Sequence, residues 1–135
     1  MIKPIRALIW EWYGAGDKSK IESTFELGNV LRQLALTPEE KSETIPDCAY
    51  CELTNQYFGR DSCFLIVCTD EVDIEPIQKI KDLSCVLENL SLEETTCFSN
   101  SIFSLPGWLK AQELSSQALK LMNWTEIQEY EKELS

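Results

Sequence analysis

Four cysteines in the middle of the chain are the residues whose type and spacing best fit a chemical site. Cys48 and Cys51 stand three positions apart, and Cys63 and Cys68 follow after eleven intervening residues. Two close pairs of thiols resemble the outline of a four-thiolate zinc site. The second pair fits poorly, because a strand would point its members to opposite faces. The sequence therefore predicts no metal and no other cofactor, and these four thiols are the candidates if a metal binds.

The Cys48–Cys51 segment also has the spacing of a redox dithiol, which needs a helix to begin at its first thiol. The residues that follow favour a strand, and this argues against redox chemistry. We expect all six cysteines, Cys85 and Cys97 included, to be reduced structural thiols.

The N-terminus lacks the long apolar stretch and the small-residue cleavage site of a signal peptide, so the expected compartment is the cytoplasm.

The composition excludes several classes of function. The 135 residues include no histidine, so the commonest general base and metal ligand is missing. The 23 acidic side chains outnumber 12 basic ones and leave a formal charge of −11, which opposes direct binding to nucleic acid. Apolar runs stop short of the roughly 18 residues that a membrane span requires. We expect a binding protein rather than an enzyme, with no contact to nucleic acid or membrane.

Acidic side chains gather in three stretches, all in the last three quarters of the chain. Residues 1–36 carry a charge of +1 and residues 37–135 carry −12. Concentrated carboxylates steer a basic partner, and an aromatic side chain among them provides a buried anchor. The third stretch contains Glu126, Glu129, Glu131 and Glu133. The predicted contact residues come from the first two stretches and from the first predicted strand: Glu39, Glu40, Glu43, Asp70, Glu71, Asp73, Glu75 and Trp12.

The elements that must position these residues are predicted from hydrophobic spacing and turn residues. β-Branched and aromatic residues predict strands over 5–13, 51–58 and 63–69, with residues 59–62 as a hairpin loop. Apolar residues at spacings of three and four predict helices over 19–36, 76–89 and 106–122. Capping signatures predict short helices after Thr37 and after Thr125.

Together these elements predict an α+β fold, with a small antiparallel sheet of about three strands packed with four or five helices. The C-terminal third is expected to be helical. With 44% hydrophobic residues and no linker or repeat, the chain is expected to form one acidic globular domain over residues 1–135. The oligomeric state stays open.

The favoured hypothesis is a protein-binding inhibitor that grips a basic partner with an acidic face. An immunity protein that covers the active-site cleft of a basic, nuclease-type toxin is one form of it. The alternative is an acidic homodimeric secretion chaperone, a class that this chain is similar to in size and acidity, although such chaperones usually open with a helix rather than a strand. A carboxylate- or metal-dependent enzyme is the third hypothesis.

Overall fold

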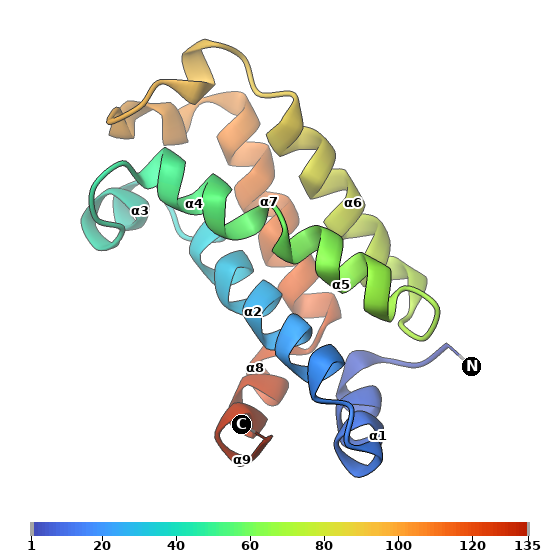
Figure 1. Ribbon diagram of the computed structural model, residues 1–135. Coiled ribbons are helices and arrows are strands. Elements are labelled where there is room, and N and C mark those ends of the chain that lie inside the picture. Colours follow the sequence, from blue (N-terminus) through green and yellow to red (C-terminus); the bar gives the residue numbers. More distant parts are fainter. Residues whose placement is uncertain (1, 135) are drawn as a thin grey trace.

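The fold is built from helices alone, as a computed structural model that describes residues 2–134 shows (Figure 1). The predicted α+β class is therefore wrong, and the described residues contain no strand, only an isolated bridge between Lys3 and Val72. The seven longer helices are α1 (Ile5–Ala15), α2 (Lys18–Leu34), α3 (Pro38–Thr44), α4 (Ala49–Tyr57), α5 (Arg60–Cys68), α6 (Ile74–Glu88) and α7 (Pro106–Leu121). Shorter turns follow as η1 (Glu93–Thr95), η2 (Asn100–Ser104), α8 (Trp124–Ile127), η3 (Gln128–Tyr130) and α9 (Glu131–Leu134).

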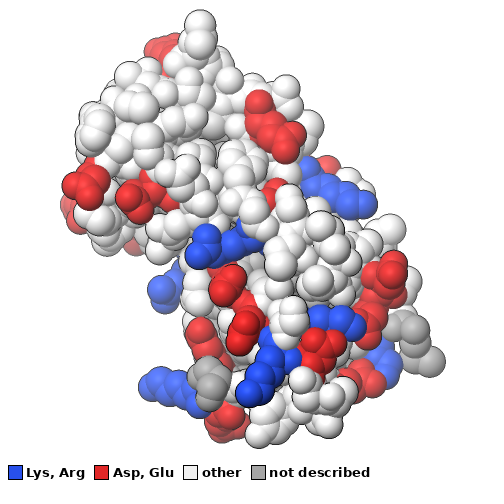
Figure 2. Space-filling view, in the orientation of Figure 1, with Lys and Arg blue, Asp and Glu red and all other residues white. Residues whose placement is uncertain are grey.

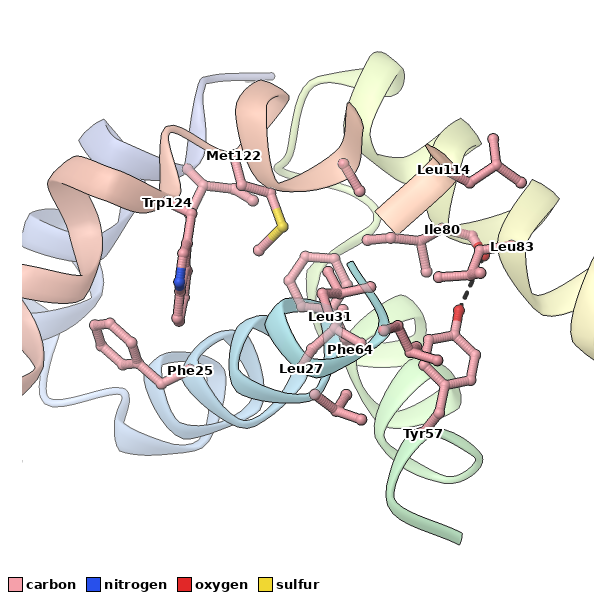
Figure 3. Close-up of a cluster of buried hydrophobic side chains, with 14 of the residues drawn as sticks. Phe25, Leu27, Leu31, Tyr57, Phe64, Ile80, Leu83, Leu114, Met122 and Trp124 are labelled. Atoms are coloured by element: carbon pink, nitrogen blue, oxygen red, sulfur yellow. Dashed lines mark hydrogen bonds between the residues drawn. The ribbon is translucent and has the colours of Figure 1, made fainter. Parts of the chain in front are cut away.

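Helix α2 runs through the middle of the molecule and contacts α1, α4, α5 and α7, while α6 packs along α7 (Figure 1). Its buried side chains include Leu27 and Leu31, which meet Phe64 of α5 and Met122 from the end of α7 in the core (Figure 3). Burial of such apolar side chains is the main favourable term in folding. The core is thus organised around one helix rather than around a sheet.

The first predicted strand is helix α1. Its buried residues are Ile5, Leu8, Ile9 and Trp12, which are spaced by three and four and so form one face of a helix. The strand prediction relied on alternating aromatic residues, but Trp10 and Tyr13 lie on the exposed side of the same helix. Gly16 ends α1 in the left-handed conformation with φ 74°, a standard helix stop.

The two other predicted strands are helices α4 and α5. Helix α4 buries Ala49, Leu53 and Tyr57, each one turn after the last, and α5 buries Phe64 and Cys68 in the same way. Residues 63–68 form a short apolar run, which has no period that separates a buried strand from a buried helix, and residues 51–58 are too few to show a clear helical period. The predicted hairpin loop at 59–62 is a junction between two helices, where Gly59 adopts φ 101°.

Four helix predictions are confirmed, in α2, α3, α6 and α7. The capping box of α3 is present: Glu40 donates its backbone N–H to Thr37 Oγ1 at 3.2 Å, and the Thr37 N–H donates to Glu40 Oε1 at 2.9 Å. The C-terminal third is helical, as predicted. The last cap is wrong, because α8 begins after Asn123 with no side-chain cap, so Thr125 lies within the helix.

Helix α2 approaches the C-terminal helices closely at Gly28. A Cβ atom at this position would lie 2.0 Å from the ring of Trp124, which is itself buried. Glycine is normally unfavourable inside a helix, so its use here is explained by this close approach. No helix among residues 2–134 combines the length and apolar character needed to cross a membrane.

Candidate functional site

The two groups of predicted contact carboxylates lie in different parts of the molecule. Glu39, Glu40 and Glu43 belong to α3, whereas Asp70, Glu71, Asp73 and Glu75 lie at the junction of α5 and α6. Figure 1 shows α3 on one side of the bundle and the α5–α6 junction on the opposite side. The structure therefore does not gather these seven residues on a single face.

The α5–α6 carboxylates lie among cations from the N-terminal part of the chain. Lys20 forms ion pairs with Glu71 and with Asp17, and the Lys3 backbone bonds to residues 71 and 73. The hydrogen bond to Glu71 raises the pKa of Lys20 above its ordinary value. This acidic stretch is thus partly neutralised within the molecule.

Trp12, the predicted aromatic contact, is only 3% exposed and belongs to the core face of α1. The exposed aromatic residues of α1 are Trp10 and Tyr13. Trp10 packs against Tyr130 with their ring centroids 4.9 Å apart. Trp12 is therefore unavailable to a partner on the surface of this fold.

Three thiols meet where α3, α4 and the segment before η2 come together. Cys48 is the N-cap of α4, Cys51 lies in its first turn, and Cys97 comes from the loop after η1. The Cys51 and Cys97 Sγ atoms are 3.7 Å apart, and all three Sγ atoms lie within 4.8 Å of one another. Of the two predicted pairs, only Cys48 and Cys51 lie in this cluster. The third thiol is Cys97, which the sequence predicted to be a structural thiol.

The other two metal candidates lie apart from this cluster, on helix α5. Cys63 Sγ is 3.3 Å from Ser23 Oγ of α2. Cys68 is fully buried, and burial raises the pKa of its thiol to about 12. Cys68 packs in the core, whereas Cys63 is exposed, and neither joins the three-thiol cluster, so the four predicted metal candidates are not a single site.

Hydrogen bonds within the cluster shift the pKa values of Cys48 and Cys51 in opposite directions. Burial tends to raise the pKa of Cys48, but amide hydrogens of Phe98 and Cys51 and the neighbouring thiols bond to its sulfur and bring the pKa below its ordinary value. The Phe98 N–H donates to Cys48 Sγ at 3.2 Å. Bonds to Cys48 and then to Cys97 raise the pKa of Cys51 to about 12. These hydrogen bonds and the N-terminus of α4 thus favour the thiolate of Cys48 over that of Cys51.

The region around this cluster carries most of the net charge. We define the acidic end as residues 37–57 and 85–109, which comprise α3, α4, the end of α6, η1, η2 and the start of α7. These residues include eight carboxylates and one cation, for a charge of −7, while the rest of the chain carries −4. The cation is Lys41, which is fully buried with its ammonium donating to the Leu36 carbonyl at 2.8 Å.

Seven of these eight carboxylates are at least partly exposed, and none forms an ion pair within the described structure. Figure 2 shows the consequence: the upper end of the visible face has acidic side chains and no basic ones, whereas both signs alternate below. Three large apolar side chains of the acidic end are exposed: Leu92 at 92%, Phe98 at 79% and Leu109 at 45%. The acidic end thus combines an unbalanced negative surface with exposed apolar groups.

A second candidate is the hollow between α2 and the C-terminal turns. Lys18 and four carboxylates line it: Glu22, Glu26, Glu131 and Glu133. These carboxylates do not converge on one point, since among the described residues only the three thiols bring three Cys, Asp or Glu ligand atoms within 4.8 Å of one another. Among the described residues, the hollow therefore holds no group of three carboxylates close enough to share one ion.

Comparisons of this chain with protein-family models, with curated proteins and with solved structures gave no significant match. The candidate site therefore rests on geometry and charge alone. Sequence reasoning found Cys48 and Cys51 from their spacing, but Cys97 follows Cys51 by 46 positions and carries no spacing signal. Phe98 was missed for the same reason, because only the fold brings it to the N-terminus of α4.

Proposed function

We propose that this chain binds a basic protein through its acidic end and inhibits it. The observation that carries the proposal is the group of seven exposed or partly exposed carboxylates with no exposed cation among them, next to Phe98. The specific form that we propose is an immunity protein that covers the active-site cleft of a nuclease-type toxin. Carboxylates then occupy the positions that nucleic-acid phosphates take in the free toxin.

Electrostatics supports a basic partner. A cluster of like charges without internal counter-charges produces a potential that attracts and orients an opposite charge, and raises its association rate. The carboxylates at the α5–α6 junction do this less well, because Lys20 lies among them. The acidic end is therefore the favoured contact surface.

Phe98 supports the proposal as an anchor. Aromatic side chains at the centre of an interface contribute much of its binding energy. Phe98 holds φ at 59°, an uncommon conformation for a residue with a side chain, and its N–H is bonded to Cys48 Sγ. A side chain whose backbone is already fixed loses less entropy when it is buried by a partner.

Binding rather than catalysis is supported by the chemistry of the available groups. The chain has no histidine, and no three of its described carboxylates bring their oxygens within 4.8 Å of one another. We propose that the protein acts in the cytoplasm, where its thiols stay reduced. The partner class therefore consists of cytoplasmic or imported basic proteins.

A homodimeric secretion chaperone is the second candidate, because the chain opens with helix α1 and not with the expected strand. Native mass spectrometry separates the two: a dimer before any partner is added favours the chaperone, and a monomer that forms a one-to-one complex favours the inhibitor.

The test is native capture from the source cell, followed by an activity assay of the captured protein. We expect a basic protein that is retained at low salt, weakened at high salt and inhibited by the purified chain. Glu39→Gln/Glu43→Gln/Glu93→Gln should lower its association rate about tenfold. The matched control is Asp70→Asn/Asp73→Asn/Glu75→Gln, which removes the same number of charges elsewhere and should leave the rate within about twofold.

Two results would contradict the proposal. One is a captured protein with an acidic or neutral surface. The other is an equal loss of affinity in the two triple variants, which would mean that total charge and not the acidic end determines binding.

A further inference from the structure

We propose that Cys48, Cys51 and Cys97 form a zinc-binding site, with three thiolate ligands from the protein and a fourth position open to water. This site is independent of the proposed partner. It differs from the predicted set of four cysteines, because Cys97 comes from a distant part of the chain and Cys63 and Cys68 take no part.

The spacing of the sulfur atoms fits tetrahedral coordination. Zinc binds thiolate sulfur at about 2.3 Å, so two ligands at the tetrahedral angle lie about 3.8 Å apart. The Cys51 and Cys97 Sγ atoms are separated by 3.7 Å, and Cys48 Sγ lies within 4.8 Å of both. A disulfide requires about 2.05 Å between sulfur atoms, so any bond among these thiols needs further movement. The arrangement therefore places the three ligands close to their metal-bound separation.

The surroundings of Cys48 resemble the outer shell of a metal site. Its sulfur accepts the Phe98 N–H at 3.2 Å and also a hydrogen bond from the Cys51 amide. Such bonds orient a ligand and spread its negative charge, and they are a regular part of metal sites. Three neighbouring thiolates would repel one another without a cation between them. Zinc removes this repulsion, and the negative potential of the acidic end attracts the ion.

The backbone on both sides of the cluster is strained. Asp47 precedes Cys48 with φ 56°, and Phe98 follows Cys97 with φ 59°. Only one other non-glycine residue in the described part of the chain, Asn123, has a positive φ. Such conformations are unfavourable for residues with side chains and concentrate at functional sites. Here they turn both segments so that their sulfur atoms face one another.

The site opens to solvent on the side of Cys97. Cys48 is buried, Cys51 is half-buried and Cys97 is exposed. Three protein ligands with one accessible position are typical of zinc sites that exchange an external ligand, whereas structural sites use four. Zinc at this place would tie the loop that carries Phe98 to the N-terminus of α4.

The experiment is zinc titration of the full chain, purified under reducing conditions, against a chelating dye, with Co²⁺ absorption as a second readout. We expect one zinc per chain and the intense d–d bands of tetrahedral, thiolate-rich Co²⁺. Cys48→Ser, Cys51→Ser and Cys97→Ser should each weaken zinc binding by about 100-fold or more, because each removes one of only three protein ligands. Cys63→Ser and Cys85→Ser are matched controls, since both replace exposed thiols outside the cluster, and they should keep full affinity.

Circular dichroism identifies any variant that fails to fold. Cys97 is exposed, so Cys97→Ser should fold normally and report on zinc binding alone. The proposal is overturned if Cys63→Ser or Cys85→Ser weakens binding as much as the cluster variants. It is also overturned if zinc does not bind, or if Co²⁺ gives no thiolate bands. A disulfide among Cys48, Cys51 and Cys97 that resists the reducing conditions would also overturn the proposal, because sulfur atoms joined in a disulfide cannot bind zinc as thiolates.

Discussion

The acidic end and the α5–α6 junction are both rich in carboxylates, yet they differ in what surrounds the charge. At the junction, Glu71 is paired with Lys20, and charge contributes to holding α1, α2 and α5 together. At the acidic end seven of the eight carboxylates are at least partly exposed without a paired cation, and the one lysine, Lys41, is buried. Carboxylates that no internal cation neutralises are available to a partner, so the comparison supports the acidic end as the proposed contact surface.

The largest expected effect on stability comes from Lys41. Burial lowers its pKa from 10.5 to about 8, although Glu40 acts in the opposite direction. Between these two values Lys41 binds more protons in the unfolded chain than in the folded chain, so its own contribution to stability should rise with pH by about 3 kcal/mol across this window. The raised pKa values of Cys51 and Cys68 act in the opposite direction above about pH 9. The measurement is therefore the difference in urea unfolding between the wild-type chain and Lys41→Met from pH 7 to 10.5, and a difference that does not change with pH would contradict the prediction.

Gly28→Ala tests the packing on which the opposite end of the molecule depends. The new methyl group meets the buried ring of Trp124, so we expect a loss of about 1–3 kcal/mol in the free energy of unfolding. Gly14→Ala is the matched control, because it lies in helix α1 with no atom within 4 Å, and it should stabilise the chain by about 0.5 kcal/mol. Thermal unfolding distinguishes the two. Equal effects would contradict the close approach of α2 and α8.

Thr37→Ala tests whether α3 holds the acidic end in place. The substitution removes the side-chain half of the capping box and should cost about 1 kcal/mol. Thr125→Ala removes the hydroxyl of the cap that the sequence predicted, and it should change stability by less than about 0.5 kcal/mol, because Thr125 makes no cap. Denaturant unfolding of both variants is the measurement. A larger loss in the free energy of unfolding from Thr125→Ala than from Thr37→Ala would mean that Thr125 caps the last helix after all.

The smallest expected effects come from neutralising single carboxylates. Glu71→Gln breaks the ion pair with Lys20 and should destabilise the chain by a few tenths of a kcal/mol. Glu43→Gln removes an unpaired charge from the acidic end and should leave stability unchanged or slightly higher. Repeating both at high salt should shrink the difference. A larger loss from Glu43→Gln would mean that the acidic end is internally neutralised after all.

The sequence predicted the long amphipathic helices well and the short apolar segments badly. Helices α2 and α7 repeat their apolar face over four turns, so their period is unambiguous. Segment 63–68 is short and continuously apolar, and segment 51–57 is short and mostly polar, so neither shows a clear helical period. The strand assigned to residues 51–58 also removed the helix that Cys48 begins. The candidate site was also predicted only in part. Cys97 and Phe98 join it only through the tertiary fold, whereas Glu39 and Glu43 were proposed from the charge pattern alone.

The most direct test of the central claim is hydrogen–deuterium exchange of the chain with and without its captured partner. We predict slower exchange in residues 37–48 and 91–105 on binding, with residues 69–75 unchanged. Protection centred on residues 69–75, with the acidic end unaffected, would contradict the account.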